Sequence, residues 1–136
     1  PIDYTVMPLE ALWWALDGQF DISHPGNWGW TAMIMQPDHI TDSMFDEGLA
    51  KLRKKRPSPA LDGLRFGAFH EGLSMQIMHI GPYGDEPATL ARMEEFARQN
   101  SYILCGKHHE IYLGDPRRSA PEKLRTILRH PIQASR

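Results

Sequence analysis

Two short apolar runs separated by turn residues open the chain. Residues 9–16 form an aromatic and apolar run, which is typical of a strand, and turn chemistry follows at Asp17-Gly18 and His24-Pro25-Gly26-Asn27. In residues 28–35, two sets of apolar or small side chains alternate, which indicates a mostly buried strand. The beginning of the chain therefore predicts two strands.

Helical spacing replaces this alternation in the next segment. Apolar residues recur at intervals of three and four, namely Phe45, Leu49 and Leu52. Charged residues occupy the far face, Thr41 or Asp42 is placed to cap the first turn, and Pro57 lies just beyond the last turn. We expect an amphipathic surface helix here.

Two more strands and a second helix are expected after the prolines. Residues 64–69 and 72–80 have strand character and are joined by a short turn at His70-Glu71-Gly72. Asp85 is the expected N-cap of a helix, because Pro87 is tolerated in a first turn. The buried stripe of that helix is predicted from the spacing of Leu90, Met93, Phe96 and Ala97.

Residues 108–116 are the most informative segment, because an acidic residue lies in the middle of a strand pattern. Side chains alternate between the two faces of a strand, so Glu110 and Tyr112 share one face while Ile111 and Leu113 take the other. Such a strand anchors in a core and also lines a pocket with charge. We therefore expect a binding site for a cation or an electrophile.

A third helix is expected near the end of the chain. Ser119-Ala120-Pro121-Glu122 has the pattern of a capping box with proline in the first turn. Leu124, Ile127 and Leu128 would then share one helical face, and His130-Pro131 would end the helix. The resulting order of strands and helices predicts an α+β fold with a mainly antiparallel sheet.

Length and charge narrow the class of protein. The 136 residues are expected to form one domain over residues 1–136. The net charge of -2, and the acids near the basic run at residues 51–56, argue against direct nucleic-acid binding. The lone Cys105 needs no oxidising compartment, no apolar run approaches the roughly 20 residues of a membrane span, and no signal-peptide pattern begins the chain. We expect a cytoplasmic protein without membrane contact.

Glu110 is the first candidate for chemistry. A carboxylate flanked by aromatic residues on a strand is partly desolvated, so it can pair with a cationic ligand or orient a water as general base. An exposed surface glutamate is the structural alternative. Tyr112 on the same face, and Tyr83 in the turn before the second helix, offer hydroxyl groups, and structural roles stay open for both.

The tryptophans of the chain all lie within its first 30 residues, at Trp13, Trp14, Trp28 and Trp30. Neighbouring aromatic residues pack in cores, but their N–H groups need partners, which also suits a pocket wall. The sequence leaves both interpretations open. Strand alternation requires Trp28 and Trp30 to share a face, and Trp13 and Trp14 to diverge.

The histidines show no metal-binding pattern. His108 and His109 are adjacent and so point to opposite faces of a strand, and we expect neither a metal nor another cofactor. Cys105 is typical of a small buried hydrophobic residue. Pro1-Ile2 resembles the start of tautomerase-superfamily enzymes, in which the N-terminal amine is a general base, so a tautomerase is one alternative.

Several blocks of residues along almost the whole chain carry a family resemblance. They are residues 6–14 with Leu12-Trp13-Trp14, residues 28–34 with Trp28-Gly29-Trp30, His79-Ile80-Gly81-Pro82-Tyr83 with residues 85–88, and residues 108–124. In this order they closely resemble GyrI-like small-molecule-binding proteins. The resemblance implies two pseudo-twofold strand-helix-strand-strand modules with a ligand pocket on a concave sheet, and it matches the family's pocket glutamate to Glu110.

The aromatic blocks are similar to a branch of this family that hydrolyses cyclopropane-bearing DNA-alkylating natural products in an aromatic cage. Aromatic walls stack on flat polycyclic ligands, and a glutamate can activate a water that opens a strained ring. The resemblance implies catalytic roles for Glu110 and Tyr112, and ligand-binding roles for Trp13, Trp14, Trp28, Trp30, Tyr83 and Glu110. Other relatives are effector domains of multidrug-responsive transcription regulators, so a non-catalytic sensing or sequestering module is the alternative.

Members of this family usually carry a further strand and helix before the block at residues 6–14, and this sequence begins after them. The resemblance therefore implies a first module that is incomplete. An unpaired strand edge and an uncovered apolar face favour pairing with a second copy. Besides a small-molecule ligand, we therefore expect a homodimer.

Overall fold

The computed structural model of the protein describes residues 3–17 and 25–135. Contacts divide the chain into two compact units. One unit holds the residues up to Ile34 together with those from Glu71 onwards, and the other is Met35–His70. The single domain over residues 1–136 stays a prediction.

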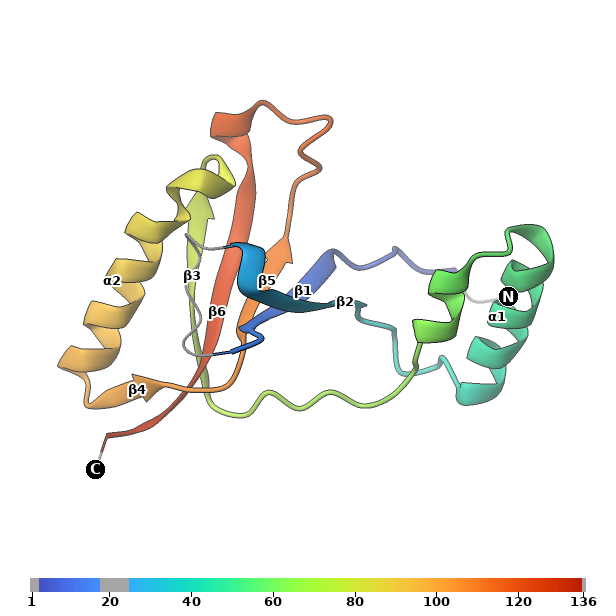
Figure 1. Ribbon diagram of the computed structural model, residues 1–136, viewed down its shortest axis with the longest axis horizontal. Helices are drawn as coiled ribbons and strands as arrows, with labels where there is room; N and C mark the ends of the chain where they lie inside the picture. Colours follow the sequence, from blue (N-terminus) through green and yellow to red (C-terminus); the bar gives the residue numbers. More distant parts are fainter. Residues whose placement is uncertain (1–2, 18–24, 136) are drawn as a thin grey trace. The chain divides into compact units, whose positions relative to one another are not determined.

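The larger unit is built on one sheet, in which every strand pairing is antiparallel. Its strands are β1 (Leu9–Ala15), β2 (Trp28–Ile34), β3 (Ser74–Ile80), β4 (Tyr102–Leu104), β5 (His108–Tyr112) and β6 (Arg125–Ala134). Their order is β2-β1-β5-β6-β3, and β4 pairs with the last residues of β6 (Figure 1). The α+β class with a mainly antiparallel sheet is confirmed, and β5 is its central strand.

Helix α2 (Glu86–Gln99) lies beside β3 and β4 (Figure 1). Its buried apolar residues are Met93 and Ala97, and His79 Nδ1 of β3 lies 2.9 Å from Thr89 Oγ1 of the helix. These contacts fix α2 against the β3 side of the sheet, where its apolar stripe is removed from water. Phe96 was expected in that stripe but is 55% exposed, because Ala97 takes the buried position.

The smaller unit contains α1 (Asp42–Lys55) and a 3-10 turn at Pro59–Gly63. The predicted cap is confirmed, since Thr41 Oγ1 accepts a hydrogen bond of 3.3 Å from the backbone N–H of Met44. No residue of α1 is buried, as expected for a surface helix. Phe45 stacks on Phe66 with ring centroids 5.6 Å apart, which packs the helix against the segment that follows it.

The predicted strand at residues 64–69 is wrong. A strand needs a neighbour that takes up its backbone hydrogen bonds, and none of the described strands pairs with this segment. Its apolar side chains behave accordingly, because Phe66 stacks on Phe45 while Leu64 and Phe69 are exposed. Residues 72–80 do contain a strand, β3, which begins at Ser74.

The predicted third helix is also wrong, since only a 3-10 turn forms at Pro121–Lys123 and β6 follows it. The physical reason is that the buried side chains recur at every second residue, as in a strand, whereas the leucine spacing also fits a helix. Leu124, Thr126 and Leu128 are buried at alternate positions, so the segment presents one face of a strand to the core. Pro131 does not end the segment either, because β6 continues through it and its carbonyl accepts a hydrogen bond from Cys105 N–H.

The remaining predictions concern turns and termini. The turns expected at residues 17–18 and 24–27 fall partly on residues 18–24, which lie outside the described residues, while Pro25–Asn27 forms a 3-10 turn. Pro1 lies outside them as well. Asp85 does occupy the N-cap position of α2, but its side chain makes no capping hydrogen bond. In the ranges 3–17 and 25–135, neither helix is long and apolar enough to cross a membrane.

The burial of Leu128 gives a test of how β6 packs in the core. Leu128 is 0% exposed, so Leu128→Ala leaves a cavity and is expected to lower the free energy of unfolding by about 2–5 kcal/mol. Leu73→Ala is the control, because Leu73 is exposed and should cost less than about 1 kcal/mol. Urea unfolding measures both, and equal losses would contradict the burial of Leu128 in the core.

Candidate functional site

The central strand β5 positions the candidate site. It pairs with β1 on one side and β6 on the other, and its residues from His108 to Ile111 are all buried. As the alternation predicts, Glu110 and Tyr112 lie on one face and His109 on the other. The register places Ala11 of β1 and Leu128 of β6 opposite Glu110, so small or apolar side chains flank its carboxylate.

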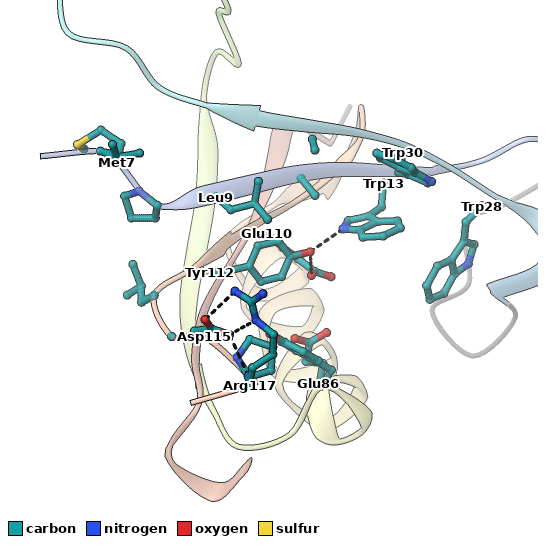
Figure 2. Close-up of a pocket in the computed structure, with 18 of the residues that line it drawn as sticks. Met7, Leu9, Trp13, Trp28, Trp30, Glu86, Glu110, Tyr112, Asp115 and Arg117 are labelled. Carbon is teal, nitrogen blue, oxygen red and sulfur yellow. Dashed lines mark hydrogen bonds and ion pairs between the residues drawn. The ribbon is translucent and has the colours of Figure 1, made fainter. Parts of the chain in front are cut away.

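Glu110 is 7% exposed and accepts hydrogen bonds at both carboxylate oxygens (Figure 2). The Tyr112 hydroxyl donates to Oε2 over 2.6 Å, and His108 Nε2 lies 3.1 Å from Oε1. These partners compensate part of the cost of burying a charged group. The interpretation of Glu110 as an exposed surface residue is therefore excluded. Its carboxylate is fixed by two hydrogen bonds at the floor of a cleft.

Tyr112 connects this carboxylate to the aromatic wall. Its hydroxyl donates to Glu110 and accepts a hydrogen bond of 3.2 Å from Trp13 Nε1–H. Burial, and then the hydrogen bond to Glu110, raise the pKa of Tyr112 well above its usual value. The phenol thus keeps its proton at physiological pH, and its hydroxyl links Glu110 to Trp13 through two hydrogen bonds.

Trp13, Trp28 and Trp30 line the same cleft as Glu110. The cleft has a volume of about 1230 Å³, which is large enough for a drug-sized molecule. Trp13 and Trp28 meet edge to face with centroids 5.5 Å apart. Trp30 is 62% exposed (Figure 2). A large exposed indole beside an apolar cleft offers a stacking surface for a flat ligand.

Trp14 does not line this cleft. It diverges from its neighbour Trp13, as strand alternation requires, and packs over Gly29 of β2. A Cβ atom at position 29 would lie only 2.5 Å from the Trp14 ring, so this contact needs glycine. Lys107 Nζ lies 3.5 Å from the centre of the same ring, which is a cation–π contact. A ligand-binding role for Trp14 thus has no support from its position.

The cleft wall next to α2 contains Tyr83 and a second carboxyl, Glu86. Tyr83 meets Tyr112 edge to face with centroids 6.0 Å apart, and burial raises its pKa. Glu86, the first residue of α2, is 2% exposed, and its Oε1 is buried with no hydrogen-bond partner among the described residues. Figure 2 shows it on the side of the cleft formed by the start of the helix.

The environment of Glu86 keeps it protonated. Burial, and then the negative charge of Glu110, raise the pKa of Glu86 from 4.5 to about 8. Backbone N–H groups at the start of a helix favour a negative charge by about 0.3–1 kcal/mol, which is less than one pKa unit. Burial therefore prevails, and the raised pKa favours the neutral acid form of Glu86.

Sequence reasoning did not single out this second carboxyl, because an acidic residue before a proline in the first turn of a helix is ordinary. Two signals were available: Glu86 lies three residues after Tyr83, which was already a candidate, and it belongs to the block at residues 85–88 that carries the family resemblance. Strand pairing across the sheet is needed to bring both next to Glu110.

The rim of the cleft combines apolar residues with one ion pair. The segment before β1 contributes Val6, Met7 and Pro8, and the loop after β5 contributes Asp115 and Arg117. Arg117 Nη2 lies 2.9 Å from Asp115 Oδ2, and this partner lowers the pKa of Asp115 to about 2. The cation at the rim is thus paired with Asp115.

The other face of the sheet has a polar network of its own. His109 is buried, with Nε2 2.8 Å from Glu10 Oε2 and Nδ1 3.0 Å from Glu71 Oε1. Arg129 Nη1 lies 3.4 Å from Glu71 Oε2. Among the described residues, no group of three or more His, Cys, Asp or Glu side chains is placed to hold a metal ion.

A family comparison supports the expected family. Residues 28–133 match the family model described as a GyrI-like small molecule binding domain. This match extends from the start of β2 almost to the end of β6, so it covers most of the sheet, α2 and the floor of the cleft. No match was found among curated proteins.

Three crystal structures of proteins from Listeria innocua are similar to this chain. An uncharacterized conserved protein has a TM-score of 0.90 at 38% identity, over 97% of this chain and 66% of its own length. A protein described as a hydrolase has a TM-score of 0.84 at 34% identity, over 98% of this chain and 66% of its own length. A second protein described as a hydrolase has a TM-score of 0.84 at 37% identity, over 96% of this chain and 65% of its own length. The chain thus spans about two thirds of the length of these relatives.

The protonated state of Glu86 predicts how stability depends on pH. With a folded-state pKa of about 8 and an ordinary value of 4.5, Glu86 holds a proton in the folded chain that the unfolded chain releases. Through this group, stability is fully present below pH 4.5 and falls as the pH rises to about 8. Glu86→Gln removes that loss. We expect its stability relative to the parent to increase by about 2–5 kcal/mol over this pH range.

Urea unfolding at a series of pH values measures this difference. The matched control is Glu94→Gln, which changes an exposed carboxyl on the same helix and should leave the pH profile as it is. A difference between Glu86→Gln and the parent that does not depend on pH would contradict the protonated state.

Proposed function

The chain belongs to the GyrI-like family of small-molecule-binding domains, and we propose that its cleft binds hydrophobic molecules that are flat or cationic. The apolar and aromatic lining favours a hydrophobic ligand, and Trp30 offers an open indole face. The negative charge of Glu110 at the floor, together with the aromatic faces, favours a positive charge on the ligand. Together these features account for both ligand types.

We further propose that the protein hydrolyses cyclopropane-bearing DNA-alkylating xenobiotics and so detoxifies them. The observation that carries this proposal is the held carboxylate of Glu110 at the base of an aromatic cleft. A carboxylate fixed by two partners is oriented to take a proton from water as that water attacks a strained ring. Tyr112 is then a positioning residue, and Trp13, Trp28, Trp30 and Tyr83 hold the ligand.

The relatives support a hydrolase without identifying a substrate. Two of the similar Listeria innocua proteins are described as hydrolases and are 34% and 37% identical to this chain. This chain spans about two thirds of the length of these relatives. Hydrolysis by the whole protein is therefore proposed and is not inferred from the relatives alone.

A non-catalytic sensing or sequestering module is the second candidate. It is favoured by the fact that both oxygens of Glu110 already accept hydrogen bonds, an arrangement that also suits a fixed counter-ion for a cationic ligand. Such a module needs the same cleft but no turnover, so the two functions differ in the fate of the ligand.

Turnover of a cyclopropane-bearing alkylator separates the two functions. We expect the parent chain to produce the ring-opened hydrate over many cycles, as detected by mass spectrometry. Glu110→Gln keeps the shape of the side chain but removes the base, so it should slow hydrolysis by about 10²–10⁴-fold while largely keeping affinity.

The control variant is Glu122→Gln, which changes an exposed carboxyl outside the cleft and should leave the rate unchanged. Stoichiometric binding by the parent, with no hydrate, would overturn the hydrolase. If Glu110→Gln loses affinity for cations as well, Glu110 acts as a counter-ion and the sensing module is favoured.

Trp30 tests the aromatic wall independently of catalysis. Removing its exposed indole by Trp30→Ala is expected to weaken binding of a flat fluorescent cation such as ethidium by about 1–2 kcal/mol, because stacking and cation–π contacts are lost. Fluorescence anisotropy measures the affinity. Phe96→Ala, which removes an exposed aromatic ring outside the cleft, should have no effect, and equal losses would contradict the cage.

A further inference from the structure

Opening a cyclopropane ring by water needs more than a base. The electron pair of the breaking C–C bond must pass to an acceptor group, and a carbonyl conjugated with the ring is the simplest one. The negative charge that develops on the carbonyl oxygen needs a proton or a hydrogen-bond donor. Glu110 cannot supply it while it accepts a proton from water, and the proton of the Tyr112 hydroxyl is already donated to Glu110.

Glu86 is a buried polar group of the cleft to which the base and its partners give no role. It belongs to the cleft wall, its side chain is almost completely buried, and Oε1 has no hydrogen-bond partner among the described residues. A buried polar atom without a partner is costly, so its retention calls for a physical reason. A ligand oxygen that accepts a hydrogen bond from this carboxyl would provide the missing partner.

We propose that Glu86 is the general acid of the hydrolysis and donates its proton to the carbonyl oxygen of a cyclopropane conjugated with a carbonyl group. This inference rests on the proposed function. It divides the work between two carboxyls from different elements of the fold, Glu110 on β5 and Glu86 at the start of α2.

The step balances with water as the only co-reactant. The water oxygen bonds to the unsubstituted ring carbon as the ring C–C bond breaks, and the electron pair of that bond moves through the conjugated system to the carbonyl oxygen. Glu110 takes the proton that the water loses, while Glu86 gives its proton to the carbonyl oxygen. The product is the hydroxyethyl enol or phenol, and exchange with solvent returns both carboxyls to their starting states.

The charges around Glu86 agree with a neutral acid. The titratable groups nearby are Tyr83 before the helix, Glu110 and Tyr112 on β5, and Asp115 and Arg117 in the next loop. Arg117 is paired with Asp115, and burial with the charge of Glu110 raises the pKa of Glu86 to about 8. The pKa values of both tyrosines are raised from 10.0, so neither titrates in this range.

Two substrates that differ in the basicity of the carbonyl oxygen test the proposal. The first is a spirocyclopropyl cyclohexadienone. The second carries electron-withdrawing groups beside the carbonyl, so its ring can open to a stable phenolate without a proton from an acid. Glu86→Gln is expected to lower kcat/KM for the first by about 10²–10⁴-fold and for the second by less than about tenfold. Glu110→Gln should slow both, and the control Glu94→Gln neither.

The parent protein gives a second measurement that needs no variant. Its rate on the first substrate should fall as the pH rises through about 8, where Glu86 loses its proton, while the rate on the second should not. No hydrate from the parent with either substrate would overturn the hydrolase and this inference together. Hydrate formation with equal Glu86→Gln effects on both substrates, or with no difference between their pH profiles, would overturn the general acid alone.

Discussion

The structure depends on one constraint, which is that its central strand is polar. β5 has neighbours on both sides, yet it carries His108, His109 and Glu110 in succession, and all are buried. Buried polar groups are tolerated only when they are hydrogen-bonded, so both faces of the sheet must supply partners. The partners of His109 come from distant parts of the chain, whereas those of Glu110 are its neighbours His108 and Tyr112 on the same strand.

The two faces meet this constraint differently. On one face, Glu10 and Glu71 close around both nitrogens of His109, which links β1 to the segment before β3. On the other face, Glu110 has its partners but lies at the floor of an open cleft, and Glu86 in the wall has an oxygen with none. Both nitrogens of His109 thus have partners within the protein, whereas the cleft retains a buried Glu86 oxygen without a partner among the described residues.

Local alternation predicted the faces of the strands, and long-range pairing decided the rest. The shared face of Glu110 and Tyr112 and the divergence of Trp13 from Trp14 follow from a period of two, and all were predicted. β6 was mistaken for a helix because Leu124 and Leu128 fit both periods and Ile127 fits the helical one, and only the pairing of β6 with β3 and β5 decides between them. Glu86 was missed because its burial depends on the packing of α2 against the sheet.

Tyr112 connects the aromatic wall of the cleft to the carboxylate at its floor. One hydroxyl group both accepts from Trp13 and donates to Glu110, so the position of the indole and that of the carboxylate are not independent. A flat ligand that shifts Trp13 would also turn the phenol and re-aim Glu110. Because hydrogen bonds in a chain polarise one another in a site of low dielectric, the bond from Trp13 and the bond to Glu110 strengthen each other. The positions of the Trp13 indole and the Glu110 carboxylate are therefore linked through one hydroxyl group.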